Sequence, residues 1–208
     1  SDVKHRWELG VIFLLAAAVL SQAKTNRGPN LEPIAPGVRA PGFALSDPDG
    51  KVVRLSELAG KVVVLEWINR NCPFVKRHYR EGTMKRLEER FGQEQVVWLA
   101  IDSTKHLDPN QNRAWIREHS LPYPILDDRK GTVGRRYGAL TTPHMFVIGK
   151  DGRIAYQGAV DDDPRGRKQS SDRTPYLEQA LSQVLAEQPV AIPETAAYGC
   201  SVKYAPQS

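Results

Sequence analysis

The alternation of apolar and polar positions along the chain predicts strands and helices in a nearly regular order. Residues 61–69 and 96–102 are almost continuous apolar runs rich in β-branched side chains, which is typical of strands buried on both faces. Residues 73–91, 109–119 and 175–187 place apolar side chains at helical spacing among charged ones, which predicts amphipathic helices. Because strands alternate with helices, we expect an α/β fold whose sheet is covered on both faces.

Shorter patterns fill the intervals between these elements. Turn residues at 47–50 predict a β-hairpin over residues 43–55, and Lys150-Asp151-Gly152 predicts a second hairpin over residues 145–158. The other predicted segments are a short strand, a short helix and a mobile polar loop, at residues 124–126, 131–137 and 161–173.

The first 23 residues have the layout of a secretory signal peptide. A basic start at Lys4-His5-Arg6 precedes the apolar run 9–20, and Ser21-Gln22-Ala23 offers small residues for cleavage. As a helix, this run would rise only ~18 Å, less than the ~30 Å core of a bilayer, so we favour a signal peptide (1–23) over an N-terminal anchor. We therefore expect an exported protein, periplasmic or extracellular, that meets a membrane only if this segment is retained.

The rest of the chain divides into a linker, one domain and a tail. Residues 24–41 contain four prolines and two glycines, which predicts an extended linker. Residues 42–188 suffice for one domain of ordinary size, and residues 189–208 form a tail without strong periodicity. The net charge of +5 comes from basic residues spread along the chain, and no nucleic-acid-binding motif accompanies them, so we expect no nucleic-acid partner.

Two cysteines, Cys72 and Cys200, carry the candidate chemistry. Cys72 lies between a predicted buried strand and a helix that begins with Pro73, the residue favoured at the first helical position. Free N–H groups and the positive end of the helix dipole favour a thiolate there, and such a setting lowers a cysteine pKa from ~8.5 toward ~3.5–7.5. We therefore interpret Cys72 as a nucleophile that is exposed at the strand–helix turn.

A proline stands just before a predicted strand in the segment Thr142-Pro143-His144. Inside a central strand it would interrupt the hydrogen-bonded ladder, but at a strand entrance it can adopt a cis peptide bond. The residue before such a proline can offer its backbone to an extended partner segment. An ordinary trans turn is the alternative.

These motifs resemble those of the thioredoxin-like superfamily and, within it, of redoxin or AhpC/TSA-type proteins. The resemblance rests on the strand VVVLEWIN, the helix start Cys72-Pro73-Phe74-Val75-Lys76, Thr142-Pro143 and the hairpin FVIGKDGRIAYQG. The acidic pair Asp161-Asp162 and the tail Gly199-Cys200-Ser201-Val202-Lys203-Tyr204 extend it to about residues 38–204. The resemblance implies a thioredoxin-like fold with a central mixed sheet, flanking helices and an N-terminal hairpin extension, together with a nucleophilic Cys72 and a cis Pro143.

The resemblance also suggests roles for further residues. Glu66 is similar to the buried acid that relays a proton in thioredoxins, although a strand-edge glutamate paired with a lysine is the alternative. Asn69 stands where typical peroxiredoxins carry Thr or Ser, which weakens peroxide reduction without excluding it. Thr142 and Pro143 would shape the substrate groove, and the further candidate contacts to substrate are Asn69, Pro73, Phe74 and His144.

The sequence departs from thioredoxins at the second cysteine of the C-x-x-C motif, which is Val75 here. Cys72 alone would stop at a mixed disulfide unless a second thiol resolves it, and Cys200 is the only candidate in the chain. The alternative from another class is a non-enzymatic binding module in which Cys72 and Cys200 form a purely structural disulfide.

The sequence therefore predicts an extracytoplasmic oxidoreductase in which Cys72 attacks and Cys200 resolves. We expect a disulfide-bearing protein as substrate first and a peroxide second, with an external thiol reductant regenerating the pair. We expect no cofactor or metal, although Cys72 and His144 carry donor atoms that soft metals such as copper prefer.

Overall fold

The computed structural model describes residues 33–92 and 96–206. The expected signal segment (1–23) lies outside the described residues, and so does the first half of the expected linker. Within the described ranges, no helix is both long and apolar enough to cross a membrane.

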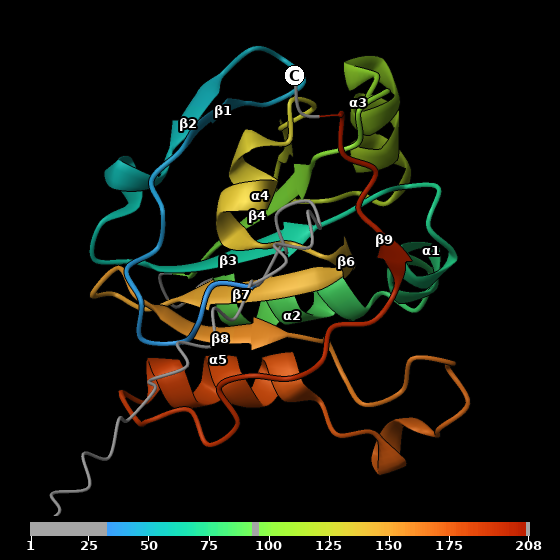
Figure 1. The fold of residues 1–208 in the computed structure, drawn as a ribbon. Helices are drawn as coiled ribbons and strands as arrows, with labels where there is room; N and C mark the ends of the chain where they lie inside the picture. Colours follow the sequence, from blue (N-terminus) through green and yellow to red (C-terminus); the bar gives the residue numbers. More distant parts are fainter. Residues whose placement is uncertain (1–32, 93–95, 207–208) are drawn as a thin grey trace, which may run out of the picture. The chain divides into compact units, whose positions relative to one another are not determined.

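A seven-stranded mixed sheet forms the centre of the domain, in the order β2-β1-β5-β4-β3-β7-β8 (Figure 1). The two apolar runs form the neighbouring strands β3 and β4, which are parallel and almost entirely buried. β5 is parallel to β4, whereas β7 and β8 add antiparallel beyond β3 and the hairpin β1–β2 completes the other edge. This arrangement confirms the predicted thioredoxin-like fold. The strands are β1 (Ala44–Ser46), β2 (Val52–Arg54), β3 (Val62–Trp67), β4 (Val96–Asp102), β5 (Ile125–Asp127), β7 (His144–Ile148) and β8 (Ile154–Gly158).

Each face of the sheet has its own apolar core. One core joins the sheet to helices α1, α2, α3 and α5, and it includes Val64, Met145 and Leu177. The other joins the opposite face to α4 and the N-terminal segment, and it includes Trp67 and Tyr137. The sheet is therefore covered on both faces, as predicted. The helices are α1 (Pro73–Arg80), α2 (Thr83–Phe91), α3 (Pro109–Glu118), α4 (Thr132–Tyr137) and α5 (Tyr176–Leu185).

The single helix predicted over residues 73–91 is in fact two helices. Gly82 adopts a left-handed conformation (φ 65°), which separates the end of α1 from the start of α2. Residues on both sides of the break, such as Tyr79 and Met84, contribute to the same core. The apolar spacing therefore continues across the break and could not show it.

The segment 161–173, predicted to be a mobile loop, is instead held by buried charges. Asp161 and Asp163 are only 6% and 3% exposed. Their carboxylates lie 4.0 and 3.8 Å from the guanidinium of Arg77, a buried residue of α1. The anchoring of these two aspartates was not predicted, because their partner lies on an element that is distant in sequence, whereas most of residues 164–172 are exposed as expected of a surface loop.

The C-terminal tail returns to the middle of the domain. It first runs beside β8, where Gln157 N–H donates to Pro193 O (3.0 Å) and Thr195 N–H donates to Gln157 O (3.1 Å). It then forms β9 (Cys200–Ser201), which pairs antiparallel with β6 (Thr141–Thr142) in a separate two-stranded sheet. Figure 1 shows β9, in dark red, beside β6. The tail thus brings Cys200 to the strand entrance that precedes Pro143.

Candidate active site around Cys72 and Cys200

Cys72 lies at the N-cap of α1, directly before Pro73. After β3 the chain turns at Asn69, whose side-chain oxygen accepts from Asn71 N–H (2.8 Å) and whose carbonyl accepts from Cys72 N–H (2.9 Å). The extended backbone of Cys72 (φ −74°, ψ 124°) then leads into the helix. The sulfur is thereby held at the positive end of a helix, as the sequence predicts.

The second part of the site is the loop that enters β7. The Thr142–Pro143 peptide bond is cis, as expected. The Cys72 thiol donates a hydrogen bond to the carbonyl oxygen of Thr142 (3.0 Å), so the loop contacts the sulfur directly. Only the protonated thiol can make this bond, and it is given up when the thiolate forms.

The third part is the tail, which places Cys200 opposite Thr142 in the β6–β9 pairing. The Thr142 hydroxyl donates to Cys200 O (3.4 Å). A Cβ atom on Gly199 would lie 2.0 Å from Thr142 O, so only glycine allows the tail backbone to approach this closely. Both cysteines are free thiols.

The two thiols influence each other's ionisation in opposite directions. Burial raises the pKa of Cys72, but hydrogen bonding by the Cys200 thiol, the Thr142 side chain and the amides of Val75 and Cys200 outweighs it, so this pKa lies below its usual value. Burial and the neighbouring Cys72 raise the pKa of Cys200 to about 11. Cys72 is therefore the thiol that ionises first, which suits a nucleophile followed by a resolving thiol.

The exposure of Cys72 differs from the prediction. The side chain is only 2% exposed, whereas Cys200 is partly exposed. The strand–helix turn alone would leave the sulfur open, but the tail and the Thr142–Pro143 loop pack over it. The reactive thiol is thus at the predicted helix start and is covered at the same time.

Glu66 is completely buried on β3 and lies in a cluster of aromatic side chains. Trp98 Nε1 donates to its carboxylate (3.1 Å), and the hydroxyls of Tyr79 and Tyr123 lie close to it. Burial raises the pKa of Glu66 to about 7, and these polar neighbours offset the rise only in part. Within the described ranges no hydrogen bond joins Glu66 to Cys72, so a role as proton acceptor stays a prediction.

The other predicted substrate contacts differ in how they are placed. Pro73 is exposed and Phe74 is half-buried beside the tail, whereas the side chain of Asn69 is occupied by its own turn. His144 is fully buried, and its two nitrogens accept from Leu140 N–H (3.2 Å) and bond to Gln157 Oε1 (2.8 Å). Burial lowers the pKa of His144 to about 4. The expectation that His144 touches substrate is therefore wrong, because both nitrogens are used inside the domain.

Sequence reasoning missed the residues that hold the tail in place. Tyr198, two positions before Cys200, inserts its hydroxyl into a buried group formed by Arg77, His78 and Asp161. On the other side of Cys200, Tyr204 donates to Ala139 O (2.8 Å). The motif around Cys200 marks this part of the tail, but nothing in its spacing identifies the partners on α1.

The comparisons with known proteins agree with this geometry. The model of the AhpC/TSA family matches residues 36–157, which is more than half of the chain. The chain belongs to the AhpC/TSA family. The matched part contains Cys72 and Thr142–Pro143 and ends before Cys200, so the family match of this AhpC/TSA protein does not extend to Cys200.

Individual relatives of this AhpC/TSA protein include an oxidoreductase. The chain is 26% identical over 118 residues to the thiol-disulfide oxidoreductase ResA of Bacillus thuringiensis subsp. konkukian, a match that covers 57% of this chain and 66% of ResA. The match thus spans just under two thirds of the length of that relative.

Solved structures support the fold over most of the chain. An uncharacterized conserved protein from Geobacillus kaustophilus superposes with a TM-score of 0.74 at 29% identity, covering 84% of this chain and 94% of that chain. A hypothetical protein from Sinorhizobium meliloti 1021 superposes with a TM-score of 0.75 at 24% identity, covering 85% and 98%.

Proposed function

We propose that this protein is an extracytoplasmic thiol–disulfide oxidoreductase in which Cys72 is the nucleophile and Cys200 the resolving thiol. The observation that carries the proposal is the pairing of Thr142 with Cys200, which sets a second thiol against a sulfur at a helix start. The similarity to ResA and the signal-like pattern of residues 1–23 support the reaction class and the location.

The two thiols of the chain supply the two electrons that reduce the substrate disulfide. The Cys72 thiolate attacks one sulfur of a substrate disulfide, forms a mixed disulfide and releases the other sulfur as a thiolate, which takes up a proton. Cys200 then loses its proton to water and attacks the Cys72 sulfur, and the second substrate sulfur leaves as a thiolate and takes up a proton. The substrate gains two electrons, the chain ends with a Cys72–Cys200 disulfide, and an external thiol reductant restores the two thiols.

Single-cysteine variants test the proposal with a peptide disulfide as substrate and dithiothreitol as reductant. We expect Cys72→Ser to abolish turnover. When dithiothreitol is left out, we expect Cys200→Ser to stop at the mixed disulfide, with the substrate trapped on Cys72 and visible by mass spectrometry. Ser56→Ala, which removes an exposed hydroxyl outside the site, serves as the control that keeps full activity.

Three outcomes would count against this proposal. Wild-type protein without turnover would remove the catalytic function, and Cys200→Ser turning over at the wild-type rate would remove the resolving role. The same variants with hydrogen peroxide test the second candidate, peroxide reduction, which the AhpC/TSA match favours. Turnover with peroxide and none with the disulfide would reverse the order of the two functions.

A further inference from the structure

The tail covers the sulfur that the proposed function requires a substrate to reach. Cys72 is 2% exposed, so a polypeptide disulfide cannot reach its sulfur in the structure as it stands. The backbone of Thr142, which can pair with an extended partner segment, is already paired with Cys200 of the tail. Tail and substrate therefore need the same strand edge.

The tail is fixed on one side of Cys200 by a buried polar group. Tyr198 donates its hydroxyl proton to Asp161, Arg77 Nη2 donates to the same hydroxyl (3.0 Å), and His78 Nε2 lies 3.0 Å from it. Arg77, His78 and Asp161 are 8%, 0% and 6% exposed, so water cannot easily replace the phenol. The tyrosine ring also packs near Phe74 in the first turn of α1, with the ring centres 6.0 Å apart.

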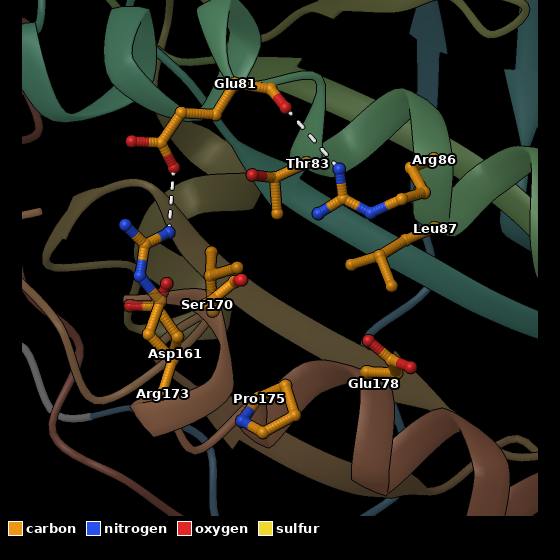
Figure 2. A pocket seen from close by; sticks show the side chains of 10 residues that line it. Glu81, Thr83, Arg86, Leu87, Asp161, Ser170, Arg173, Pro175 and Glu178 are labelled. Atoms are coloured by element: carbon orange, nitrogen blue, oxygen red, sulfur yellow. Dashed lines mark hydrogen bonds and ion pairs between the residues drawn. The ribbon is translucent and has the colours of Figure 1, made fainter. Parts of the chain in front are cut away.

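The acidic loop that contains Asp161, the acceptor of Tyr198, is also bound to α1 through Arg173. Arg173 bonds to Glu81 at the end of α1 (2.9 Å) and to Asp163 (3.0 Å), which ties the acidic loop to the helix. Figure 2 shows the Arg173–Glu81 pair and Asp161 on one wall of a cavity of about 600 Å³ that contains neither cysteine. The acidic loop that receives Tyr198 is therefore tied to α1 independently of the tail, so the hydrogen bonds of Tyr198 can break without releasing this loop.

We propose that residues 198–204 form a latched cover over Cys72, and that Tyr198 is the positioning residue of the latch. A disulfide-bearing segment reaches Cys72 only after β9 leaves the edge of Thr141–Thr142, and the returning tail both displaces the segment and brings Cys200 to the mixed disulfide. Opening of the cover makes and breaks no covalent bond. The identity of the substrate in this inference rests on the proposed function. The existence of the cover does not depend on that function.

Alkylation of Cys72 measures the opening directly and needs no catalytic activity. In a Cys200→Ser background, the rate of reaction with N-ethylmaleimide is divided by the thiolate fraction, obtained from the ultraviolet absorbance of the thiolate against pH. We expect Tyr198→Phe to raise this rate about 10-fold, which corresponds to about 1.4 kcal/mol and is the size of a hydrogen bond to a charged group.

Tyr137→Phe is the matched control for this measurement. Tyr137 is also a buried tyrosine that donates one hydrogen bond, to Pro41 O (2.8 Å), so its hydroxyl holds the N-terminal segment and not the tail. An unchanged rate in Tyr198→Phe would overturn the latch. An equal rise in Tyr137→Phe would also overturn it, because it would show general loosening of the domain.

A second measurement tests the competition for the strand edge. In the same background, we expect the rate at which Cys72 captures an unstructured peptide disulfide to rise by the same factor as alkylation in Tyr198→Phe. If alkylation becomes faster and capture does not, then the tail and the substrate do not compete for the edge of Thr141–Thr142. Absence of capture in every variant would instead reject the proposed function, while the alkylation result still decides the cover.

Discussion

The carboxyl group of Glu66 lies in the interior of the domain, and among residues 33–92 and 96–206 no ion pair joins it to a basic side chain. Burial raises its pKa from 4.5 to about 7, and this shift makes stability depend on pH. Below pH 4.5 the group is protonated in both states and costs nothing. As the pH rises toward 7, the unfolded chain releases the proton first, so stability falls, and above pH 7 the loss is constant.

The size of this loss can be measured with Glu66→Gln, whose amide can still accept from Trp98. A shift of this size corresponds to about 3 kcal/mol. We therefore expect the free energy of unfolding in urea to fall by about 2.5 kcal/mol more in the wild type than in the variant between about pH 5 and pH 8, because part of the change lies below pH 5. Glu89→Gln, an exposed change on α2, should follow the wild type. Parallel curves for wild type and Glu66→Gln would mean that the carboxyl group is ionised throughout.

At the scale of single residues, the sequence predicts the local backbone around each candidate residue. It does not predict which side chains are buried by distant parts of the chain. Pro73 after an apolar run predicts the helix start at Cys72, which is a property of neighbouring residues. The proline before a strand permits a cis bond at Pro143, and the family resemblance implies it. The burial of Cys72 depends on the tail, which is far along the chain, and the pairing of His144 depends on Gln157 of the adjacent strand β8, so no spacing within either segment reports them.

At the scale of elements, β9 depends on one glycine. Gly199 has a φ of 140°, and a methyl group there would meet the carbonyl of Thr142. We expect Gly199→Ala to move β9 away from β6 and to destabilise the protein by about 1–3 kcal/mol, the usual cost of a strained backbone. Since the amide and thiol of Cys200 help to lower the pKa of Cys72, that pKa should rise toward the value of an ordinary cysteine.

The thiolate absorbance of Cys72 against pH measures this change, and Gly50→Ala provides the control. Gly50 also has a positive φ (86°), but a methyl group there has open space around it, in the turn between β1 and β2. The control should lose some stability and keep the wild-type pKa of Cys72. If Gly199→Ala also keeps that pKa, then β9 does not contribute to ionisation of the nucleophile.

Length decides which elements a sequence reveals. The long buried strands β3 and β4 have enough residues to show their pattern, and their positions match the prediction. β6 and β9 have two residues each, which is too short for any periodicity, so the pairing that brings Cys200 to Thr142 was not predicted. The position of Cys72 at a helix start could therefore be predicted from the sequence, whereas the position of Cys200 beside Thr142 is seen only in the fold.

At the scale of the whole molecule, the two cysteines are far apart in the sequence, and a disulfide between them would close a loop spanning 128 positions (200 − 72). Restricting the unfolded chain in this way stabilises the folded state by roughly 5 kcal/mol in the chain-entropy model. For a domain of this size, that corresponds to a rise in Tm of about 10–20 °C.

We therefore expect the oxidised protein to unfold at a clearly higher temperature than the reduced protein, as measured by circular dichroism with and without dithiothreitol. Cys200→Ser should show no difference between the two conditions. Equal unfolding temperatures in the wild type would mean that the Cys72–Cys200 bond does not form. The rate of reduction then separates the two roles of such a bond, because a catalytic disulfide beside a partly exposed Cys200 should reduce quickly under mild dithiothreitol. A disulfide that resists reduction until the domain unfolds would identify a structural crosslink, in which the tail is locked to the domain and Cys72 attacks no substrate.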